Sequence, residues 1–166
     1  MLKIFDSLAE IDFRQLMDVY EEGNRICGKE RYPELSENLQ MLYAEQDFYS
    51  YLEVFFRNPS ARYAVWVVDG RYAAALRLES YDDGLLLNAL ETAPAMRCKG
   101  FATDLVQAVL DHLRCSGNGI LYSHVRKDNT SSLRVHHSCG FHIHSEKALY
   151  LDGTVRSDSY TLSNHY

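Results

Sequence analysis

The spacing of apolar residues changes at about residue 60, and this change most constrains the fold. Before it, residues 34–57 place Leu, Tyr and Phe about every 3.5 positions, which is typical of helices. After Asn58-Pro59-Ser60, residues 63–68 and 72–78 have compositions typical of strands, and Asp69-Gly70 between them favours a tight hairpin turn. The chain therefore combines N-terminal helices with a sheet that begins shortly after residue 60.

The residues before this change predict at least two helices. Residues 7–10 have the S-x-x-E form of a capping box, so we expect a helix to begin there, with an apolar stripe that ends at Tyr20. Gly23 and Gly28 interrupt the pattern, and a helix break is expected at them. Asp47 is a candidate break within the second helix, which would then divide into two.

The remaining elements alternate between strands and helices. The clearest is residues 102–113, whose apolar positions follow a helical repeat and which Gly117 and Gly119 end. The predicted order is βααβββαβαββ, an α/β (α+β) chain with a mostly antiparallel sheet and one crossover helix. Its 166 residues predict one domain over residues 1–166. The other predicted elements are strands at residues 2–5, 85–92, 120–125 and 141–151, a last strand ending at Leu162, and a short helix at residues 129–138.

The net charge of −6 lies entirely in the first third of the chain. Residues 1–60 hold 12 acidic and 6 basic side chains, whereas residues 61–166 hold 11 of each. Without a basic stripe, the chain is not expected to bind nucleic acid. Its longest apolar run, residues 63–68, is far shorter than the ~20 residues that cross a bilayer. Because the N-terminus also lacks a signal-peptide pattern, we expect a cytoplasmic protein without a membrane partner.

The cysteine and histidine residues do not form a metal-ligand pattern. Four cysteines without a C-x-x-C spacing predict free thiols rather than a zinc knuckle or a disulfide framework. His142 and His144 would share one face of a strand, and His136, His137 and Cys139 lie nearby in sequence. No H-x-x-x-H accompanies them, so we expect no metal.

The segment Pro94–Ala102, between a strand and an amphipathic helix, points to anion binding. Free amides at a helix N-terminus attract anions, and Gly100 and Ala102 would let a phosphate approach the backbone. Arg97 and Lys99 add positive charge. An ordinary capped helix start would have the same spacing. The G-x-x-x-x-G-K-[ST] and G-x-G-x-x-G patterns are absent, so the nucleotide folds that they mark are not indicated.

Two blocks of sequence resemble the GCN5-related N-acetyltransferase (GNAT) superfamily. Residues 97–102, Arg-Cys-Lys-Gly-Phe-Ala, are similar to its [RQ]-x-x-G-x-[GA] acetyl-coenzyme A signature. Residues 125–141 are similar to its V-R-x-x-N-x-x-[AS]-x-x-L-Y-x-x-x-G-F block, with His136 at the tyrosine position. The resemblance implies a mixed, mostly antiparallel sheet of about seven strands with about four helices and with splayed fourth and fifth strands. Residues 1–60 would form the acceptor side, and residues 61–166 the acetyl-CoA-binding core.

The resemblance also implies where the coenzyme lies. Its pyrophosphate would lie on the amides of residues 98–102, and its pantetheine arm along the strand that ends at residue 92. A backbone N–H of the splayed strand would stabilise the oxyanion of the transition state. The implied coenzyme-binding residues are Leu90, Thr92, Arg97, Cys98, Lys99, Gly100, Phe101, Ala102, Asn129 and Ser132.

Direct attack of an amine on a thioester needs a base for the amine and a proton for the departing thiolate. Glu91, at the end of the fourth strand, and His124, where relatives that acetylate ribosomal proteins carry a glutamate, are the two candidate bases. The alternatives are a solvated strand end and a hydrogen-bonded strand histidine. His136 would replace the tyrosine acid, because an imidazolium with a pKa near 6.5 protonates a thiolate of pKa about 8.5 downhill. Otherwise, His136 only packs at the helix end.

The function implied is that of an acetyl-CoA-dependent N-acetyltransferase acting on a primary amine of a small molecule or peptide, as a monomer or homodimer. The acidic first 60 residues suit a cationic amine, unless their charges form a solvated face and their aromatic side chains a core. The competing functions are a non-catalytic acyl-CoA binding or sensing module and an unrelated α/β protein with chance motifs. The aromatic residues in question are Tyr32, Tyr43, Phe48, Tyr49 and Tyr51.

Overall fold

A seven-stranded sheet with the order β1-β2-β3-β4-β5-β9-β6 forms the centre of the computed structural model, which describes residues 1–166. Strands β4 and β5 are parallel, and all other neighbours in the sheet are antiparallel. A separate hairpin pairs β7 with β8. The mostly antiparallel sheet predicted from the sequence is therefore confirmed. The strands are β1 (Leu2–Phe5), β2 (Arg62–Val68), β3 (Arg71–Tyr81), β4 (Gly84–Thr92), β5 (Ile120–Arg126), β6 (His142–Ser145), β7 (Ala148–Leu149), β8 (Val155–Arg156) and β9 (Ser159–His165).

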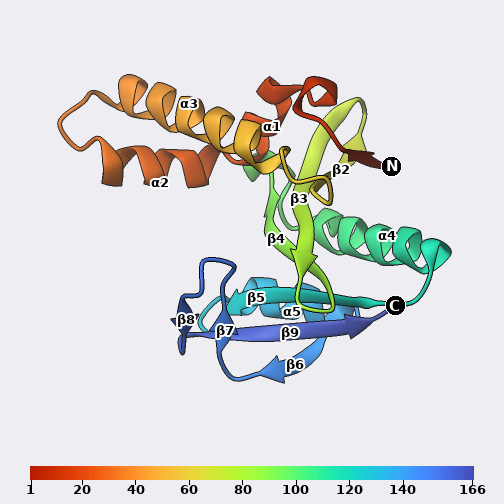
Figure 1. The fold of residues 1–166 in the computed structure, drawn as a ribbon. Coiled ribbons are helices and arrows are strands. Elements are labelled where there is room, and N and C mark those ends of the chain that lie inside the picture. The colour runs from red at the N-terminus through yellow and green to blue at the C-terminus, as the bar shows by residue number, and fades with distance from the viewer.

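Five α-helices accompany the sheet, one more than expected. In Figure 1, α2 and α3 extend side by side from one end of the molecule, and α4 lies beside β3 and β4 on the opposite side. None of the helices has the length and apolar character that a membrane span requires. The helices are α1 (Phe13–Val19), α2 (Glu21–Arg31), α3 (Glu37–Phe55), α4 (Phe101–Ser116) and α5 (Thr130–Ser138), with single 3-10 turns at Leu8–Glu10 and Pro94–Met96.

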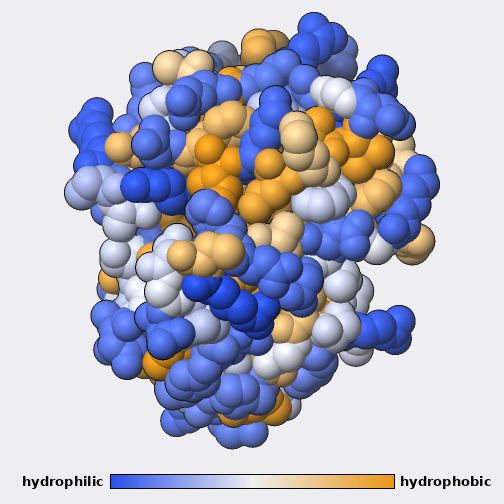
Figure 2. Space-filling view, turned by 90° about the vertical axis from the view of Figure 1, so that its right-hand side faces the viewer, coloured by the Kyte–Doolittle hydropathy of each residue, from blue (hydrophilic) through white to orange (hydrophobic).

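Two hydrophobic cores lie on the two faces of the sheet. Because side chains alternate along a strand, β3 supplies both: Leu76 and Leu78 pack with α4, whereas Ala75 packs with Leu16 of α1 and Leu52 of α3. Viewed from the side of α4, the hydrophobic part of the surface is concentrated in the upper half of the molecule, and the lower half is mostly hydrophilic (Figure 2). The two cores fix α1 and α3 on one face and α4 on the other.

The first helix begins later than its sequence predicts. The side chain of Ser7 makes no capping hydrogen bond, and the residues after it form only the 3-10 turn Leu8–Glu10. The helix α1 begins after Asp12, whose carboxylate accepts a hydrogen bond of 3.2 Å from the backbone N–H of Gln15. Asp12 is thus the functioning N-cap, and the capping box predicted at residues 7–10 is wrong.

The predicted helix breaks at Gly23, Gly28 and Asp47 are also wrong. Helix α2 runs through both glycines, and a Cβ atom at Gly28 would lie 2.5 Å from the carbonyl oxygen of Gln40 on α3. Gly28 therefore permits the close approach of two helices. Helix α3 is continuous, and the carboxylate of Asp47 forms an ion pair of 2.6 Å with Arg31, which ties α3 to the end of α2.

The predicted strand at residues 141–151 is divided into β6 and β7. Its register with β9 shifts between Ile143 and Ser145, and β7 then leaves the main sheet to pair with β8. A bulge of this kind bends a strand away from its neighbour. The β7–β8 hairpin consequently lies beside the end of β5, next to His124.

Candidate active site

Strands β4 and β5 separate partway along their length. They pair only where Leu85–Leu87 meet Leu121–Ser123, although β4 continues to Thr92 and β5 to Arg126. Backbone groups of strands that diverge lose their ladder partners and become available to a ligand. The splay predicted for these two strands is therefore confirmed.

A bulge in β4 lies just beyond the last residue that pairs with β5. Arg77 faces Asn88 and Ala75 faces Glu91, so that Ala89 and the next residue lie opposite a single residue of β3. Ala89 has a φ of 52°, in the left-handed region. The buried hydroxyl of Tyr20 donates a hydrogen bond of 2.7 Å to the carbonyl of Ala89. The sequence indicated Tyr20 only as part of an apolar stripe. In the structure it lies in the core shared with α1 and α3, and its hydroxyl stabilises the bulge from that side of the sheet.

We expect Tyr20→Phe to weaken the bulge. The change leaves the Ala89 carbonyl without its partner, so the free energy of unfolding should fall by about 1–3 kcal/mol. Tyr43→Phe is the control, because Tyr43 is 41% exposed and removal of a solvated hydroxyl should cost little. Urea denaturation of both variants measures the difference. Equal losses in the two would show that the Tyr20 hydrogen bond does not stabilise the bulge.

A cavity of about 540 Å³ opens between the end of β4, the start of α4 and the start of α5. Nine of the ten residues predicted to bind coenzyme line it; Lys99 is the exception, and its ammonium donates instead to the Ala95 carbonyl at 3.3 Å. The candidate base Glu91 also lines it. Sequence patterns did not identify the other lining residues, which are Glu22, Met96, Thr103, Ser131, Arg134 and Val135.

The loop before α4 has the backbone conformation of an anion cradle. Cys98 and Gly100 have φ values of 60° and 85°, and Gly100 is the N-cap of α4. A Cβ atom at Gly100 would have no atom within 4 Å, so the space beside this backbone is open. Successive amides in such a loop, followed by a helix N-terminus, bind phosphate groups.

Arg97 turns toward carboxylates rather than toward the start of α4. Its guanidinium lies 2.5 Å from the carboxylate of Glu22 on α2 and 4.0 Å from that of Glu91, and its Nε donates to the Thr92 carbonyl at 3.3 Å. Burial raises the pKa of the Glu91 carboxyl, Arg97 opposes this effect and Glu22 adds to it. Arg97 therefore joins this cavity to the N-terminal helices.

The α5 side of the cavity is organised by Asn129. Its side-chain oxygen accepts hydrogen bonds from the backbone N–H of Ser132 at 3.1 Å and from the hydroxyl of Ser131 at 3.0 Å. Asn129 is thus the N-cap of α5. Asn129 and Ser132, which were both predicted to contact the coenzyme, lie on one wall of the cavity. The hydrogen bond between them also caps the start of α5.

His124 lies on β5 immediately after the residues that pair with β4. Its Nε2 is 3.3 Å from the hydroxyl of Tyr81, which itself donates to the Leu149 carbonyl at 2.9 Å. Because that hydroxyl has no second proton, Nε2 carries the hydrogen and Nδ1 holds a free lone pair, which is buried without a partner. Burial lowers the pKa of His124, so the ring is held neutral. His124 is not among the residues that line the cavity.

His136 is inside the protein, with 1% of its surface exposed, and it does not line the cavity. Its Nδ1 donates to the Ser132 carbonyl at 2.8 Å, its ring packs edge-on against Phe141, and its Nε2 is buried without a partner. Burial lowers its pKa. The histidine that replaces the family's tyrosine is consequently neutral at neutral pH, with its proton on Nδ1.

We expect the free energy of unfolding to fall as the pH drops below about 6.5. The unfolded chain binds a proton at His136 near that pH, whereas burial lowers the pKa in the folded protein, so protonation favours unfolding. His136→Phe should therefore reduce the slope of stability against pH between about 5 and 7. Denaturation at several pH values measures it; an unchanged slope would contradict this role of burial.

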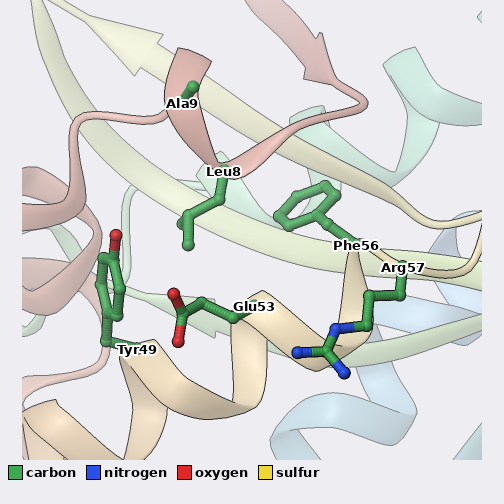
Figure 3. Close-up of a pocket in the computed structure, with 6 residues that line it drawn as sticks. All are labelled: Leu8, Ala9, Tyr49, Glu53, Phe56 and Arg57. Carbon is green, nitrogen blue, oxygen red and sulfur yellow. The ribbon is translucent and has the colours of Figure 1, made fainter.

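A second, shallow cavity of about 450 Å³ lies between the Leu8–Glu10 turn and the end of α3. Figure 3 shows Leu8 pointing from the turn toward the space between Tyr49, Glu53 and Phe56. Tyr49, one of the aromatic residues predicted for the acceptor side, lines it, but none of the predicted catalytic or coenzyme-binding residues does. The chain also contains no group of three or more His, Cys, Asp or Glu side chains arranged to hold a metal ion.

The comparisons with known proteins agree with this geometry. The sequence matches the family described as "Acetyltransferase (GNAT) family" over residues 16–141. No curated protein matches the chain significantly.

Solved structures of low sequence identity share the fold. The PaiA N-acetyltransferase of Thermoplasma acidophilum, in complex with coenzyme A, is 14% identical, with a TM-score of 0.64 over 100% of this chain and 99% of that one. The ribosomal-protein-S18-alanine N-acetyltransferase of Escherichia coli is 18% identical, with a TM-score of 0.63 over 99% and 94%. The N-acetyltransferase PseH of Campylobacter jejuni, in complex with acetyl coenzyme A, is 12% identical, with a TM-score of 0.66 over 99% and 98%. With its splayed strands, its glycine loop and the family match over most of its length, this chain belongs to the acetyltransferase (GNAT) family.

Proposed function

We propose that this protein transfers the acetyl group of acetyl-CoA directly to a primary amine. The observation that carries the proposal is that one cavity joins three features: the unpaired end of β4, the glycine loop before α4, and the carboxylate of Glu91. Two of the similar structures hold coenzyme A or acetyl coenzyme A, which supports acetyl-CoA as the co-substrate.

The proposed coenzyme position follows the cavity. The pyrophosphate would lie against the amides of residues 98–102, and the pantetheine arm along residues 88–92 of β4, opposite Asn129 and Ser132. The thioester would then lie beside the bulge at Ala89. A freed N–H of the bulge would donate to the carbonyl oxygen as it becomes an oxyanion, a contribution typically of about 2.7–4 kcal/mol.

Glu91 is the proposed base. Its carboxylate takes a proton from the acceptor's ammonium group, and the free nitrogen attacks the thioester carbon. The carbon–sulfur bond then breaks as the carbonyl reforms, and the attacking nitrogen gives up its second proton, leaving an amide and a thiolate that takes up a proton. Glu91 lines the cavity next to the bulge, and burial raises the pKa of its carboxyl, which strengthens it as a base. His124, with the free lone pair on Nδ1, is the second candidate.

The proton for the thiolate has three candidate sources, which are His136, the attacking nitrogen and water. The arrangement of His136 favours transfer from the attacking nitrogen or from water, because its Nε2 bears no proton and its Nδ1 is engaged with the Ser132 carbonyl. His136→Phe separates the possibilities. A fall in kcat of about 100-fold or more would assign the acid role to His136, and a small change would leave it a packing residue.

The acceptor side is proposed to consist of residues 1–60, where the excess negative charge lies. Tyr43, Tyr49 and Tyr51 on α3 are 41–42% exposed. The ring of Tyr51 already lies 4.5 Å from the guanidinium of Arg77, so Tyr43 and Tyr49 are the members of the set available to a cationic amine. Other members pack on one another, as Tyr32 does on Tyr43 at 5.3 Å between ring centres. The charge and the exposed tyrosines support an amine that is cationic before it reacts.

Release of coenzyme A in the presence of a panel of amines tests the proposed reaction. We expect acetylated product, identified by its mass, with at least one primary amine. Binding of acetyl-CoA without turnover on any amine would instead favour a non-catalytic acyl-CoA binding or sensing module. The feature that supports this second function is the buried histidine at the position of the family's tyrosine. Absence of coenzyme A binding in calorimetry would exclude both functions.

A further inference from the structure

Arg77 is a cation without a counter-ion on the acceptor face of the sheet. It belongs to β3, two positions after Ala75, so both side chains lie on the face that carries α1 and α3. The nine ion pairs of the chain do not include it. Its Nε is buried and donates no hydrogen bond. A partly buried guanidinium without a carboxylate is uncommon, because removal of its charge from water is costly unless a partner compensates.

Aromatic rings hold the guanidinium in place. It lies 4.5 Å from the ring centre of Tyr51 and 5.7 Å from that of Phe55, both on α3. Tyr63 is directly opposite Arg77 on β2, and its hydroxyl is also buried without a partner. Stacking orients the planar group without neutralising its charge, and its buried Nε donates no hydrogen bond. Arg77 is therefore positioned before any anion arrives.

The carboxylate of Glu79, on the same face of the sheet as Arg77, already accepts a hydrogen bond. Glu79 lies two residues along β3, and its carboxylate accepts a hydrogen bond of 3.0 Å from the side-chain amide of Asn88. Asn88 is the residue opposite Arg77, and it precedes the bulge in β4. Asn88 thus binds the carboxylate of Glu79, and that carboxylate forms no ion pair with Arg77.

The position of Arg77 relates it to the proposed reaction. Ala75 faces Glu91 across the β3–β4 pair, so Arg77 and Glu91 are diagonal neighbours on one face. In a regular ladder such neighbours are about 7–8 Å apart at the backbone, and here the extra residue of the bulge lies between them. A negative and a positive side chain at this separation suit a small molecule with a positive group at one end and a negative group at the other.

We propose that Arg77 binds a carboxylate of the acceptor, and that the acceptor is a free amino acid. The inference rests on the proposed acetyl transfer: the amine would approach Glu91 and the bulge, while the carboxylate pairs with the fork of N–H donors on Arg77. This assignment narrows the acceptor from any cationic amine to one that also carries an acidic group.

Acceptors with and without an acidic group test whether the protein recognises the carboxylate of the acceptor. L-Alanine, L-alaninamide and ethylamine share the amine and differ in the acidic group, and the dipeptide alanyl-alanine moves the carboxylate farther away. We expect kcat/KM for alanine to exceed that for the amide and for ethylamine by about 10- to 100-fold, as for a charge-assisted pair. Similar values for all four would overturn the proposal, and preference for the dipeptide would replace the free amino acid with a peptide.

Variants of Arg77 test whether this residue causes the preference for an acceptor with a carboxylate. Arg77→Gln should bring the alanine-to-alaninamide ratio to near one, chiefly through KM, and Arg77→Lys should keep part of it because the charge remains. Arg71→Gln, an exposed arginine of the same strand, should leave the ratio unchanged. Because the ratio compares two acceptors on one preparation, it does not depend on the fraction of protein that is folded. An unchanged ratio in Arg77→Gln would overturn the assignment.

A binding measurement separates this inference from the reaction itself. Alanine is titrated by calorimetry into the protein saturated with coenzyme A, in which no transfer occurs. Binding that Arg77→Gln abolishes supports the carboxylate site even if no amine is acetylated. Turnover of simple amines together with absence of alanine binding would leave acetyl transfer intact and overturn the role of Arg77.

Discussion

Replacement of Glu91 with glutamine is expected to lower kcat by about 100- to 10,000-fold, the usual contribution of a general base. The amide keeps the size of the side chain and its place beside the bulge, but it cannot take a proton from an ammonium group. Steady-state release of coenzyme A measures the loss. Calorimetric binding of acetyl-CoA should change little, because the proposed role of Glu91 is toward the acceptor.

The pH dependence gives a second measure of the same role. Burial raises the pKa of the Glu91 carboxyl above its usual range, so activity is lost as the pH falls through that raised pKa. This acidic limb of kcat/KM should vanish in Glu91→Gln and persist in Glu30→Gln, an exposed control on α2. A large loss in His124→Gln combined with a small one in Glu91→Gln would transfer the base role to His124.

Replacement of Gly100 with valine is expected to raise the dissociation constant for coenzyme A by about 10- to 100-fold. A β-branched side chain is strained at a φ of 85°, and its methyl groups would occupy the open space where the pyrophosphate is proposed to lie. The loop would either lose its left-handed conformation or exclude the phosphates. Calorimetric titration with coenzyme A measures the change.

Gly153→Val is the matched control for this variant. Gly153 has a φ of 83° in the turn between β7 and β8, and a Cβ atom there would also meet nothing within 4 Å. Both changes impose the same backbone strain, but only Gly100 lines the cavity. Weakened binding in both variants would mean that general destabilisation, and not the phosphate cradle, explains the effect.

Sequence patterns predicted the sheet region better than the N-terminal helices. The turn at Asp69-Gly70, the strand that became β4 and the helix that became α4 are confirmed, because local periodicity and turn residues determine them. The prediction that Gly23 and Gly28 break a helix was wrong, because α2 runs through both residues. A glycine that permits close packing has the same local signature as one that ends a helix, and only the contact of Gly28 with α3 distinguishes them.

Within the candidate site, backbone contacts were predictable and side-chain partners were not. The 97–102 block has a spacing that indicates a loop at a helix start, and the structure places all of it except Lys99 on the cavity. The pairing of Arg97 with Glu22 depends on where α2 lies relative to the end of β4, which no local pattern encodes. The same holds for Tyr20, whose hydroxyl reaches a bulge 69 residues away in sequence.

The sequence by itself determined the change from helices to strands near residue 60, the glycine loop and the excess of negative charge in the first 60 residues, because these follow from composition and local spacing. Only the tertiary structure decided that His136 is buried and neutral and that Arg77 has no counter-ion. The physical reason is that the protonation and pairing of a charged side chain depend on the solvent and neighbours around it, and packing brings those neighbours together from distant parts of the chain.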